Sequence, residues 1–146
     1  MKKFLSKYGV VVGIVLALGL FIVLSVIIKE EPIKEMSSNM EEWLTDTASD
    51  EYVVTVIAQT TCSHCINFKP VMQKANNEYE FKLYWLEADE LTNNDYNALT
   101  GTYDLEDYSG TPYTFITKNG EVLDHLSGER DYDTLIEFLE NNNVIE

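Results

Sequence analysis

Apolar positions divide this chain into one long uncharged run and a series of shorter segments with helix or strand periodicity. The uncharged run covers residues 8–28. As a helix it would rise about 30 Å, which matches the hydrocarbon core of a bilayer. We therefore expect one N-terminal transmembrane helix at residues 8–28.

The charges that flank this run predict its orientation. Residues 1–7 contain three lysines, whereas glutamates follow the run. Because lysine-rich flanks remain on the cytoplasmic side, residues 1–7 are expected in the cytoplasm and the rest of the chain outside it. A cleaved signal peptide is the alternative, but its apolar stretch is usually shorter and ends in small residues, whereas this one ends in Val26-Ile27-Ile28. We expect an uncleaved anchor.

Beyond the run, residues 29–37 have mixed charges, Pro32 and no periodicity, which is typical of an exposed linker. Residues 38–146 are expected to form one folded domain. Ser38 and Glu41 have the spacing of a capping box at the start of a first helix. The apolar face expected for this helix consists of Met40, Trp43, Leu44 and Thr47.

The next segments alternate between strand and helix patterns. Residues 52–58 are apolar or β-branched nearly throughout, which is typical of a strand buried on both faces of a sheet. Apolar residues at helical spacing then begin at Cys62 and predict a helix in which Pro70 interrupts the hydrogen-bond ladder. The elements expected after it are a strand at 81–88, a short polar helix at 91–99 and an irregular acidic stretch at 101–109.

The C-terminal part has the pattern of a hairpin followed by a helix. Residues 113–117 and 121–126 are strand-like and are joined by a turn that contains Asn119-Gly120. The helix face expected after them consists of Tyr132, Leu135, Ile136 and Leu139. The earlier strands can pair in parallel through right-handed crossovers, whereas a hairpin is antiparallel. The order of elements therefore predicts an α/β fold in which helices flank a mixed sheet.

The overall charge narrows the class of partner. The 146 residues carry a formal net charge of −15. The part beyond residue 28 carries −18, because seven of the ten basic and all 25 acidic side chains lie there. Such a charge would repel nucleic-acid phosphates, so we expect no nucleic-acid partner.

Cys62 and Cys65 are the two cysteines of the chain, and they lie where a predicted strand meets a predicted helix. A two-residue spacer at that place suits a reversible disulfide, because the helix N-terminus stabilises the attacking thiolate. Outside the cytosol such a pair can cycle or stay oxidised. A purely structural disulfide is the alternative, but closing so short a loop constrains the unfolded chain little. We interpret the pair as redox-active.

Ser63 and His64 occupy the spacer, and they are the residues expected to tune the redox potential. A partly protonated imidazole near Cys62 would stabilise its thiolate, and with it the reduced protein, which makes the disulfide a stronger oxidant. A surface histidine without this effect is the alternative. His125 lies in the hairpin, and we interpret it as structural. A zinc site built from both histidines and both cysteines would have an unusual geometry, so no metal is expected.

Several motifs, in order along the chain, resemble those of the thioredoxin family from about Ser38 to the C-terminus. They are the C-x-x-C pair after a strand, Pro70, the Gly110-Thr111-Pro112 loop, the turn Lys118-Asn119-Gly120-Glu121-Val122 and Gly128. The matching family features are the active-site helix with its kinking proline, the cis-proline loop, the hairpin turn and a late glycine. A lone C-x-x-C is a weak signal, whereas the combination in this order is specific.

The resemblance implies a thioredoxin fold and thiol-disulfide oxidoreductase activity. It implies that Cys62 exchanges disulfides with the substrate and that Cys65, the more buried thiol, resolves the mixed disulfide. Thr61, Thr111 and Pro112 would line the substrate groove, with a cis bond at Thr111-Pro112 that leaves the Thr111 backbone free to pair with an extended substrate. No bound cofactor is implied, because the disulfide itself carries two electrons.

The chain also departs from the thioredoxin pattern. The buried aspartate of thioredoxins aligns with Val56, and the tryptophan before the first cysteine is Thr61 here. Efficient reduction of a broad range of proteins is therefore not expected. The segment between Cys65 and Pro112 is longer than in thioredoxins, with extra acidic residues and tyrosines at 103–108. We expect a solvated surface insertion there, and a substrate-selecting loop is the alternative.

Similar membrane-anchored proteins occur among bacteriocin transport accessory proteins and extracytoplasmic thioredoxins of bacteria. This resemblance implies a single-pass protein of the cell membrane whose domain faces outward and whose substrates are secreted or cell-envelope thiol proteins or peptides. His64 slightly favours disulfide donation, whereas reduction or isomerisation would require electrons from a membrane redox partner. The alternatives are a non-catalytic binding or secretion accessory module and a tethered chaperone whose acidic surface binds basic clients.

Overall fold

The computed structural model describes residues 36–146. The expected cytoplasmic segment at residues 1–7, the expected anchor at residues 8–28 and all but the last two positions of the expected linker at residues 29–37 lie outside the described residues. Among residues 36–146, no helix has both the length and the apolar composition needed to cross a membrane.

The described elements form one sheet and the helices around it. In chain order they are α2 (Met40–Thr47), β1 (Val53–Ala58), α3 (Ser63–Tyr79), β2 (Lys82–Glu87), α4 (Asn93–Thr102), β3 (Tyr113–Lys118), β4 (Glu121–Ser127) and α5 (Tyr132–Asn141). The four strands are arranged in the order β2-β1-β3-β4. β1 pairs with β2 in parallel and with β3 in antiparallel orientation, and β3 and β4 form an antiparallel hairpin. The predicted mixed sheet is confirmed.

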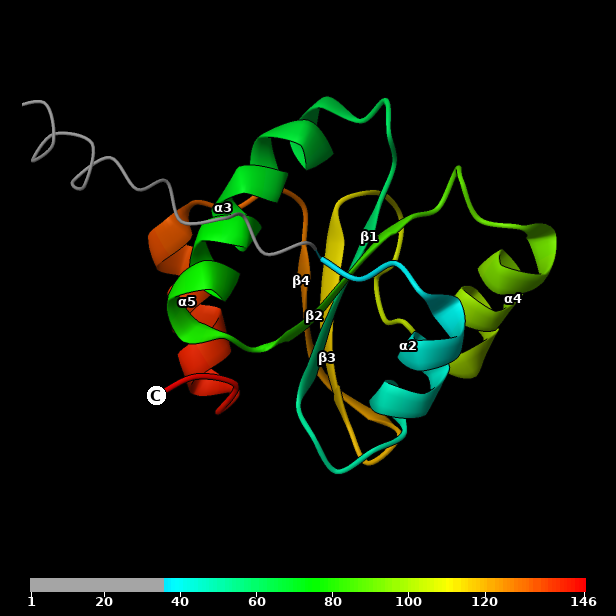
Figure 1. The fold of residues 1–146 in the computed structure, drawn as a ribbon. Helices are drawn as coiled ribbons and strands as arrows, with labels where there is room; N and C mark the ends of the chain where they lie inside the picture. Colours follow the sequence, from blue (N-terminus) through cyan, green and yellow to red (C-terminus); the bar gives the residue numbers. More distant parts are fainter. Residues whose placement is uncertain (1–35) are drawn as a thin grey trace, which may run out of the picture. The chain divides into compact units, whose positions relative to one another are not determined.

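Helices cover both faces of this sheet (Figure 1). α3 and α5 lie on one face, and α2 and α4 lie on the other. The side chains of β1 alternate between the two layers: Val54, Val56 and Ala58 pack with the α3 layer, whereas Val53 and Ile57 pack with the α2 layer. All six residues of β1 are buried, as expected for a strand in the middle of a covered sheet.

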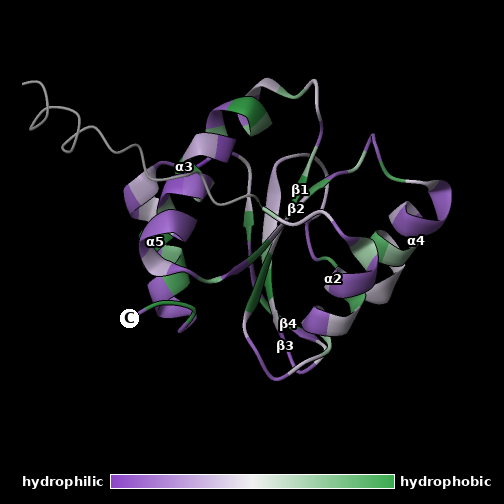
Figure 2. Cartoon of the chain, viewed as in Figure 1, coloured by the Kyte–Doolittle hydropathy of each residue, from purple (hydrophilic) through white to green (hydrophobic). Residues whose placement is uncertain are grey.

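Hydropathy along the chain follows this layering (Figure 2). The strands are mostly hydrophobic, and the helices carry polar residues on the surfaces that face away from the sheet. Trp43 of α2, Phe68 of α3 and Leu139 of α5 are fully buried. Each of these helices therefore contributes an apolar face to the core, which is the main source of its stability in the fold.

The hairpin turn has the geometry that its sequence predicts. Asn119 and Gly120 have φ values of 54° and 76°, so both central residues are in the left-handed region. A turn with two positive φ values matches the right-handed twist of the flanking strands, and Asn-Gly adopts it at the lowest cost. The prediction of a hairpin between β3 and β4 is confirmed.

The prediction of a Ser38 capping box is wrong by one residue. Asn39 is the N-cap of α2, and its side-chain oxygen accepts hydrogen bonds from the backbone N–H groups of Glu41 at 3.0 Å and Glu42 at 3.3 Å. The asparagine oxygen thus satisfies the free donors that a Ser38 hydroxyl was expected to satisfy. Leu44 is 41% exposed, because it lies at the margin of the stripe centred on Trp43.

The segment after β2 also differs from the prediction. α4 begins after Thr92, whose hydroxyl accepts a hydrogen bond from the Asp95 N–H at 3.2 Å, and it continues to Thr102. Tyr103 is only 8% exposed and packs edge-to-face on Trp43 with ring centroids 5.9 Å apart. The solvated insertion expected at 103–108 is therefore only partly present: its acidic residues are exposed, but Tyr103 belongs to the core.

Candidate active site

Cys62 lies between the end of β1 and the start of α3, where it is the N-cap of the helix. Its sulfur accepts a hydrogen bond from the Cys65 N–H, with an Sγ–N distance of 3.2 Å. Cys62 is partly exposed, whereas Cys65, one turn into the helix, is 2% exposed. Both are free thiols. The expectation that Cys62 is the accessible member of the pair agrees with this geometry.

The surroundings of the two sulfurs shift their acidities in opposite directions. Burial alone would raise the pKa of Cys62, but hydrogen bonds from Cys65, the Thr111 side chain and the backbone outweigh it and leave the pKa below its ordinary value. Burial raises the pKa of the Cys65 thiol, and its hydrogen bond to Cys62 raises it further. The site therefore favours a Cys62 thiolate next to a Cys65 thiol.

The loop before β3 lies beside the Cys62 sulfur. The Thr111-Pro112 peptide bond is cis, as the resemblance implied. The Cys62 thiol lies 3.4 Å from the Thr111 carbonyl oxygen, to which it can donate. Pro112 is buried, and its carbonyl oxygen accepts a hydrogen bond from the Gly128 N–H at 2.8 Å. The Cys62 thiol therefore lies against the cis-proline loop, and Gly128 holds that loop from a third part of the chain.

Two hollows border this loop. A hollow of about 590 Å³ is lined by Thr111 together with His64 and Gly128, and a smaller one of about 240 Å³ is lined by Thr111, Pro112 and Gly128. Both hollows share Thr111 and Gly128, so both adjoin the cis-proline loop. Thr61 is exposed before Cys62 but is not among the residues that line either hollow.

The spacer residues differ in their contacts. Ser63 is the exposed first residue of α3. The His64 Nδ1 atom lies 2.8 Å from the Glu129 Oε2 atom in the loop after β4. The hydrogen bond and the charge of Glu129 raise the pKa of His64, and the charge of Cys62 adds to this shift. The structure therefore supplies the imidazole with a carboxylate partner.

Glu129 is a residue that sequence reasoning missed, because it is separated from His64 by 65 positions. One feature of the sequence could have indicated it. Glu129 directly follows Gly128, which matches the late glycine of the thioredoxin pattern, and Gly128 contacts Pro112 in the fold.

Glu87, at the end of β2, is a second carboxylate that sequence reasoning missed. Its Oε1 atom accepts a hydrogen bond from Trp85 Nε1 at 2.7 Å and lies 3.1 Å from Lys69 Nζ. Its Oε2 atom is buried and has no hydrogen-bond partner. Trp85, Val56 and Cys65 belong to the same core cluster. Glu87, bonded to Trp85, therefore places a carboxylate beside this cluster, in which the position of the buried thioredoxin aspartate is occupied by the apolar Val56.

His125 lies away from the thiols in the β3–β4 hairpin, and its ring stacks on Tyr113 with centroids 5.4 Å apart and an interplanar angle of 17°. This contact agrees with a structural role. Within residues 36–146, no group of three or more His, Cys, Asp or Glu side chains is placed to hold a metal ion.

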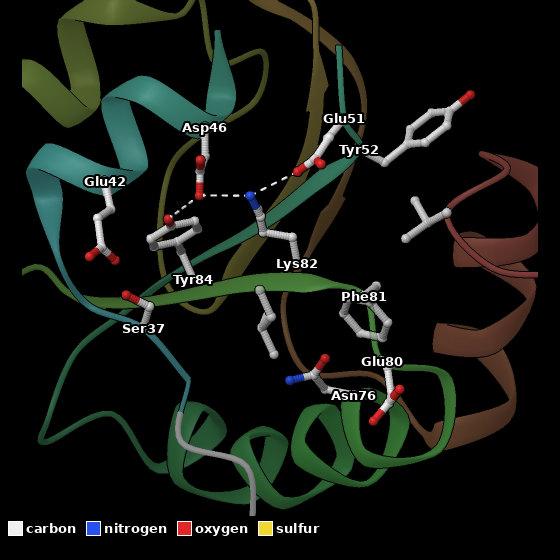
Figure 3. A pocket seen from close by; sticks show the side chains of 12 residues that line it. Ser37, Glu42, Asp46, Glu51, Tyr52, Asn76, Glu80, Phe81, Lys82 and Tyr84 are labelled. Carbon is white, nitrogen blue, oxygen red and sulfur yellow. Dashed lines mark hydrogen bonds and ion pairs between the residues drawn. The ribbon is translucent and has the colours of Figure 1, made fainter. Parts of the chain in front are cut away.

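A larger hollow, of about 710 Å³, lies at the opposite end of the sheet, beside the start of β2 (Figure 3). Lys82 Nζ bridges Asp46 at 3.1 Å and Glu51 at 2.8 Å, and the Tyr84 hydroxyl donates a hydrogen bond to Asp46. These charges satisfy one another, and the lining residues in the described part of the chain include neither cysteine nor histidine. The candidate site is therefore the region of the two smaller hollows that share Thr111, whose carbonyl oxygen lies 3.4 Å from the Cys62 sulfur.

Comparison with solved structures finds thioredoxins. Thioredoxin from Aeropyrum pernix superposes with a TM-score of 0.62 at 19% identity, over 71% of this chain and 83% of that one. Thioredoxin from Trypanosoma brucei brucei superposes with a TM-score of 0.60 at 17% identity, over 80% of this chain and 96% of that one. At these identities the similarity shows the fold.

The oxidized form of mitochondrial thioredoxin 3 from Saccharomyces cerevisiae gives a TM-score of 0.56 at 16% identity, over 73% of this chain and 92% of that one. The search of curated proteins finds no match. The thioredoxin family model matches residues 32–141, which is most of the sequence. The chain therefore belongs to the thioredoxin family.

Proposed function

We propose that this protein is a membrane-anchored, extracytoplasmic thiol-disulfide oxidoreductase that acts on secreted or cell-envelope proteins or peptides. The observation that carries the proposal is the position of the Cys62 sulfur. It lies partly exposed at the α3 N-terminus, accepts a hydrogen bond from the Cys65 N–H at 3.2 Å and lies 3.4 Å from the Thr111 carbonyl oxygen. Membership of the thioredoxin family supports thiol-disulfide chemistry in general.

In the oxidising direction, a substrate thiolate attacks the Cys62 sulfur of the Cys62–Cys65 disulfide. The Cys65 sulfur leaves and takes up a proton. A second substrate thiolate then attacks the substrate sulfur of the mixed disulfide, which forms the substrate disulfide and releases Cys62 as a thiolate. Two electrons thus pass from the substrate dithiol to the protein.

The acidities of the two thiols suit this sequence. The lowered pKa of Cys62 makes it a good leaving group in the second step, and the raised pKa of Cys65 keeps the proton taken up in the first. A protonated His64 next to Cys62 stabilises the reduced protein, which favours oxidation of substrates over their reduction. A disulfide of a membrane redox partner would then reoxidise the pair.

The compartment is proposed from the sequence. The uncharged run at residues 8–28 and the lysines at residues 1–7 support a single-pass anchor with the domain outside the cytoplasm. The formal charge of −18 beyond the run supports basic rather than acidic substrates.

Trapping of intermediates tests the activity. Cys65→Ser removes the resolving thiol, so the full-length variant should accumulate a mixed disulfide with a substrate through Cys62. Cys62→Ser is the matched control and should accumulate none, because Cys65 is 2% exposed. Non-reducing gels of membranes from cells that express each variant provide the measurement.

Two outcomes would contradict the proposal. If Cys65→Ser traps no adduct and wild-type protein does not exchange with glutathione, the chain is a non-catalytic binding module. If protease added outside intact cells leaves the domain uncut, the proposed orientation is wrong.

A further inference from the structure

The loop after β4 places a carboxylate on the imidazole of the C-x-x-C spacer. Glu129 Oε2 lies 2.8 Å from His64 Nδ1. The backbone on both sides of Glu129 is held in place: the Gly128 N–H donates to the Pro112 carbonyl oxygen at 2.8 Å, and Arg130 Nη1 donates to the Glu129 carbonyl oxygen at 2.9 Å. Gly128 has a φ of +81°, a conformation that side chains rarely adopt. The position of Glu129 is therefore tied to the cis-proline loop.

We propose that Glu129 is a positioning residue for disulfide exchange, which holds the His64 imidazolium near Cys62 and so keeps the Cys62 thiolate stabilised at neutral and mildly alkaline pH. The inference rests on the proposed function, because it concerns the regulation of the same thiol. Glu129 itself touches neither sulfur; it acts through His64.

The physical reason is the protonation state of the imidazole. A histidine with an ordinary pKa of about 6.5 is only about one-tenth protonated at pH 7.5. The bond and the charge of Glu129 favour the protonated ring, and the charge of Cys62 favours it further. Since the imidazolium donates through Nδ1 to Glu129, its positive charge is kept at the N-terminal turn of α3, where the Cys62 sulfur lies.

The other charged side chains around His64 have hydrogen-bond partners of their own. Arg130 and Asp131 line the same hollow. The Asp131 carboxylate is the N-cap of α5 and accepts a hydrogen bond from the Thr134 N–H at 2.9 Å. Arg130 is bonded to the Glu129 carbonyl oxygen. Among the described residues that line this hollow, Glu129 is therefore the carboxylate that contacts His64.

Glu129 also carries a negative charge, which disfavours the Cys62 thiolate, whereas the His64 imidazolium favours it. The two effects separate with pH. At pH 5.5 an imidazole is largely protonated with or without Glu129, so only the direct charge remains. At pH 7.5 the loss of Glu129 also lowers the protonated fraction of His64, because the contact with Glu129 raises the pKa of the imidazole. The effect of losing Glu129 on the ionisation of Cys62 must therefore differ between pH 5.5 and pH 7.5.

The test compares full-length Glu129→Gln with wild type and with Glu121→Gln, each in detergent micelles. Glu121 is the matched control, because it is an exposed glutamate at the far end of β4. The His64 titration is followed by NMR with labelled histidine, which is simple because the chain has two histidines. The ionisation of Cys62 is followed by the pH dependence of its alkylation by iodoacetamide, and the redox equilibrium is measured against glutathione.

In Glu129→Gln, His64 should titrate at a lower pH than in wild type, and Cys62 alkylation at pH 7.5 should fall about threefold. The loss of one positive charge close to a thiolate in water would reduce the reactivity about sixfold, and the simultaneous loss of the Glu129 charge offsets part of that reduction. A threefold change in the exchange equilibrium is a potential about 14 mV more reducing. At pH 5.5 this loss should disappear or reverse. Glu121→Gln should match wild type at both pH values.

The same Glu129→Gln change in a His64→Ala background should cause no loss of Cys62 reactivity at pH 7.5. The inference is overturned if His64 titrates identically in wild type and Glu129→Gln, or if the loss at Cys62 persists without His64. Failure of the wild-type pair to exchange with glutathione would instead refute the proposed function, while the histidine titration would still decide whether Glu129 controls His64.

Discussion

The hydrogen bond between Trp43 and Thr55 connects α2 to the central strand and permits a quantitative stability prediction. Trp43 Nε1 donates to Thr55 Oγ1 at 2.9 Å, and both side chains are fully buried. Trp43→Phe leaves the Thr55 hydroxyl buried without this donor, which costs about 1–3 kcal/mol. The smaller ring leaves unfilled volume that costs about 1 kcal/mol more. We expect the free energy of unfolding to fall by about 2–4 kcal/mol.

Thr55→Val alone should cost about 1–3 kcal/mol, because it leaves the indole N–H unpaired. The double variant removes both polar groups, so its cost should be smaller than the sum of the single costs by about 1–2 kcal/mol. Urea unfolding of the full-length protein in a nonionic detergent, followed by circular dichroism, measures each value. Leu44→Ala is the control on the same helix and should cost less than about 1 kcal/mol, since Leu44 is 41% exposed. Additive costs of the two single substitutions would show that the Trp43–Thr55 hydrogen bond does not couple the two side chains.

Three further predictions concern local features of the fold and the acidity of the thiols. Asn39→Ala removes the N-cap of α2 and should lower the free energy of unfolding by about 1 kcal/mol, whereas Ser38→Ala should have almost no effect. Equal effects of the two substitutions would contradict the assignment of Asn39 as the N-cap. Gly120→Val places a β-branched residue at a φ of 76° and should cost about 1–2 kcal/mol by urea unfolding, and an unchanged midpoint would contradict the turn geometry. In the reduced protein, alkylation of Cys62 should reach half its maximum at a clearly lower pH than alkylation of Cys65, because the surroundings lower the pKa of Cys62 and burial raises that of Cys65. The pKa of Cys62 is lower in the folded than in the unfolded protein, so ionisation of Cys62 should stabilise the reduced fold. This stabilisation should be complete above the pKa of an unfolded thiol, about 8.5, and should be lost as the pH falls through the pKa of Cys62 in the folded protein. Similar alkylation midpoints for both thiols would contradict the assignment.

The sequence predicts the order of elements because their patterns are unambiguous. The apolar run at 52–58 becomes β1, and Asn119-Gly120 forms the turn between β3 and β4. The placement of Cys62 at the start of α3 and the cis bond before Pro112 also agree with the expectations. These features depend on local backbone preferences or on motifs a few residues long.

The features that the sequence did not predict depend on contacts between distant residues. Tyr103 looks like part of a polar insertion, and only the packing of α4 against α2 shows that its ring contacts Trp43. The contact between His64 and Glu129 spans 65 positions and depends on the path of the loop after Gly128. The choice of Asn39 over Ser38 as N-cap is a difference of one residue between two good capping side chains.

The equilibrium reduction potential of the full-length protein, titrated against glutathione redox buffers, decides whether the Cys62–Cys65 pair exchanges disulfides and in which direction. We predict reversible exchange with a potential near or above about −180 mV, the range of proteins that donate or rearrange disulfides. A value near about −270 mV would refute the oxidising direction and indicate a reductant. No exchange between glutathione and Cys62 would show that the protein is not a thiol-disulfide oxidoreductase.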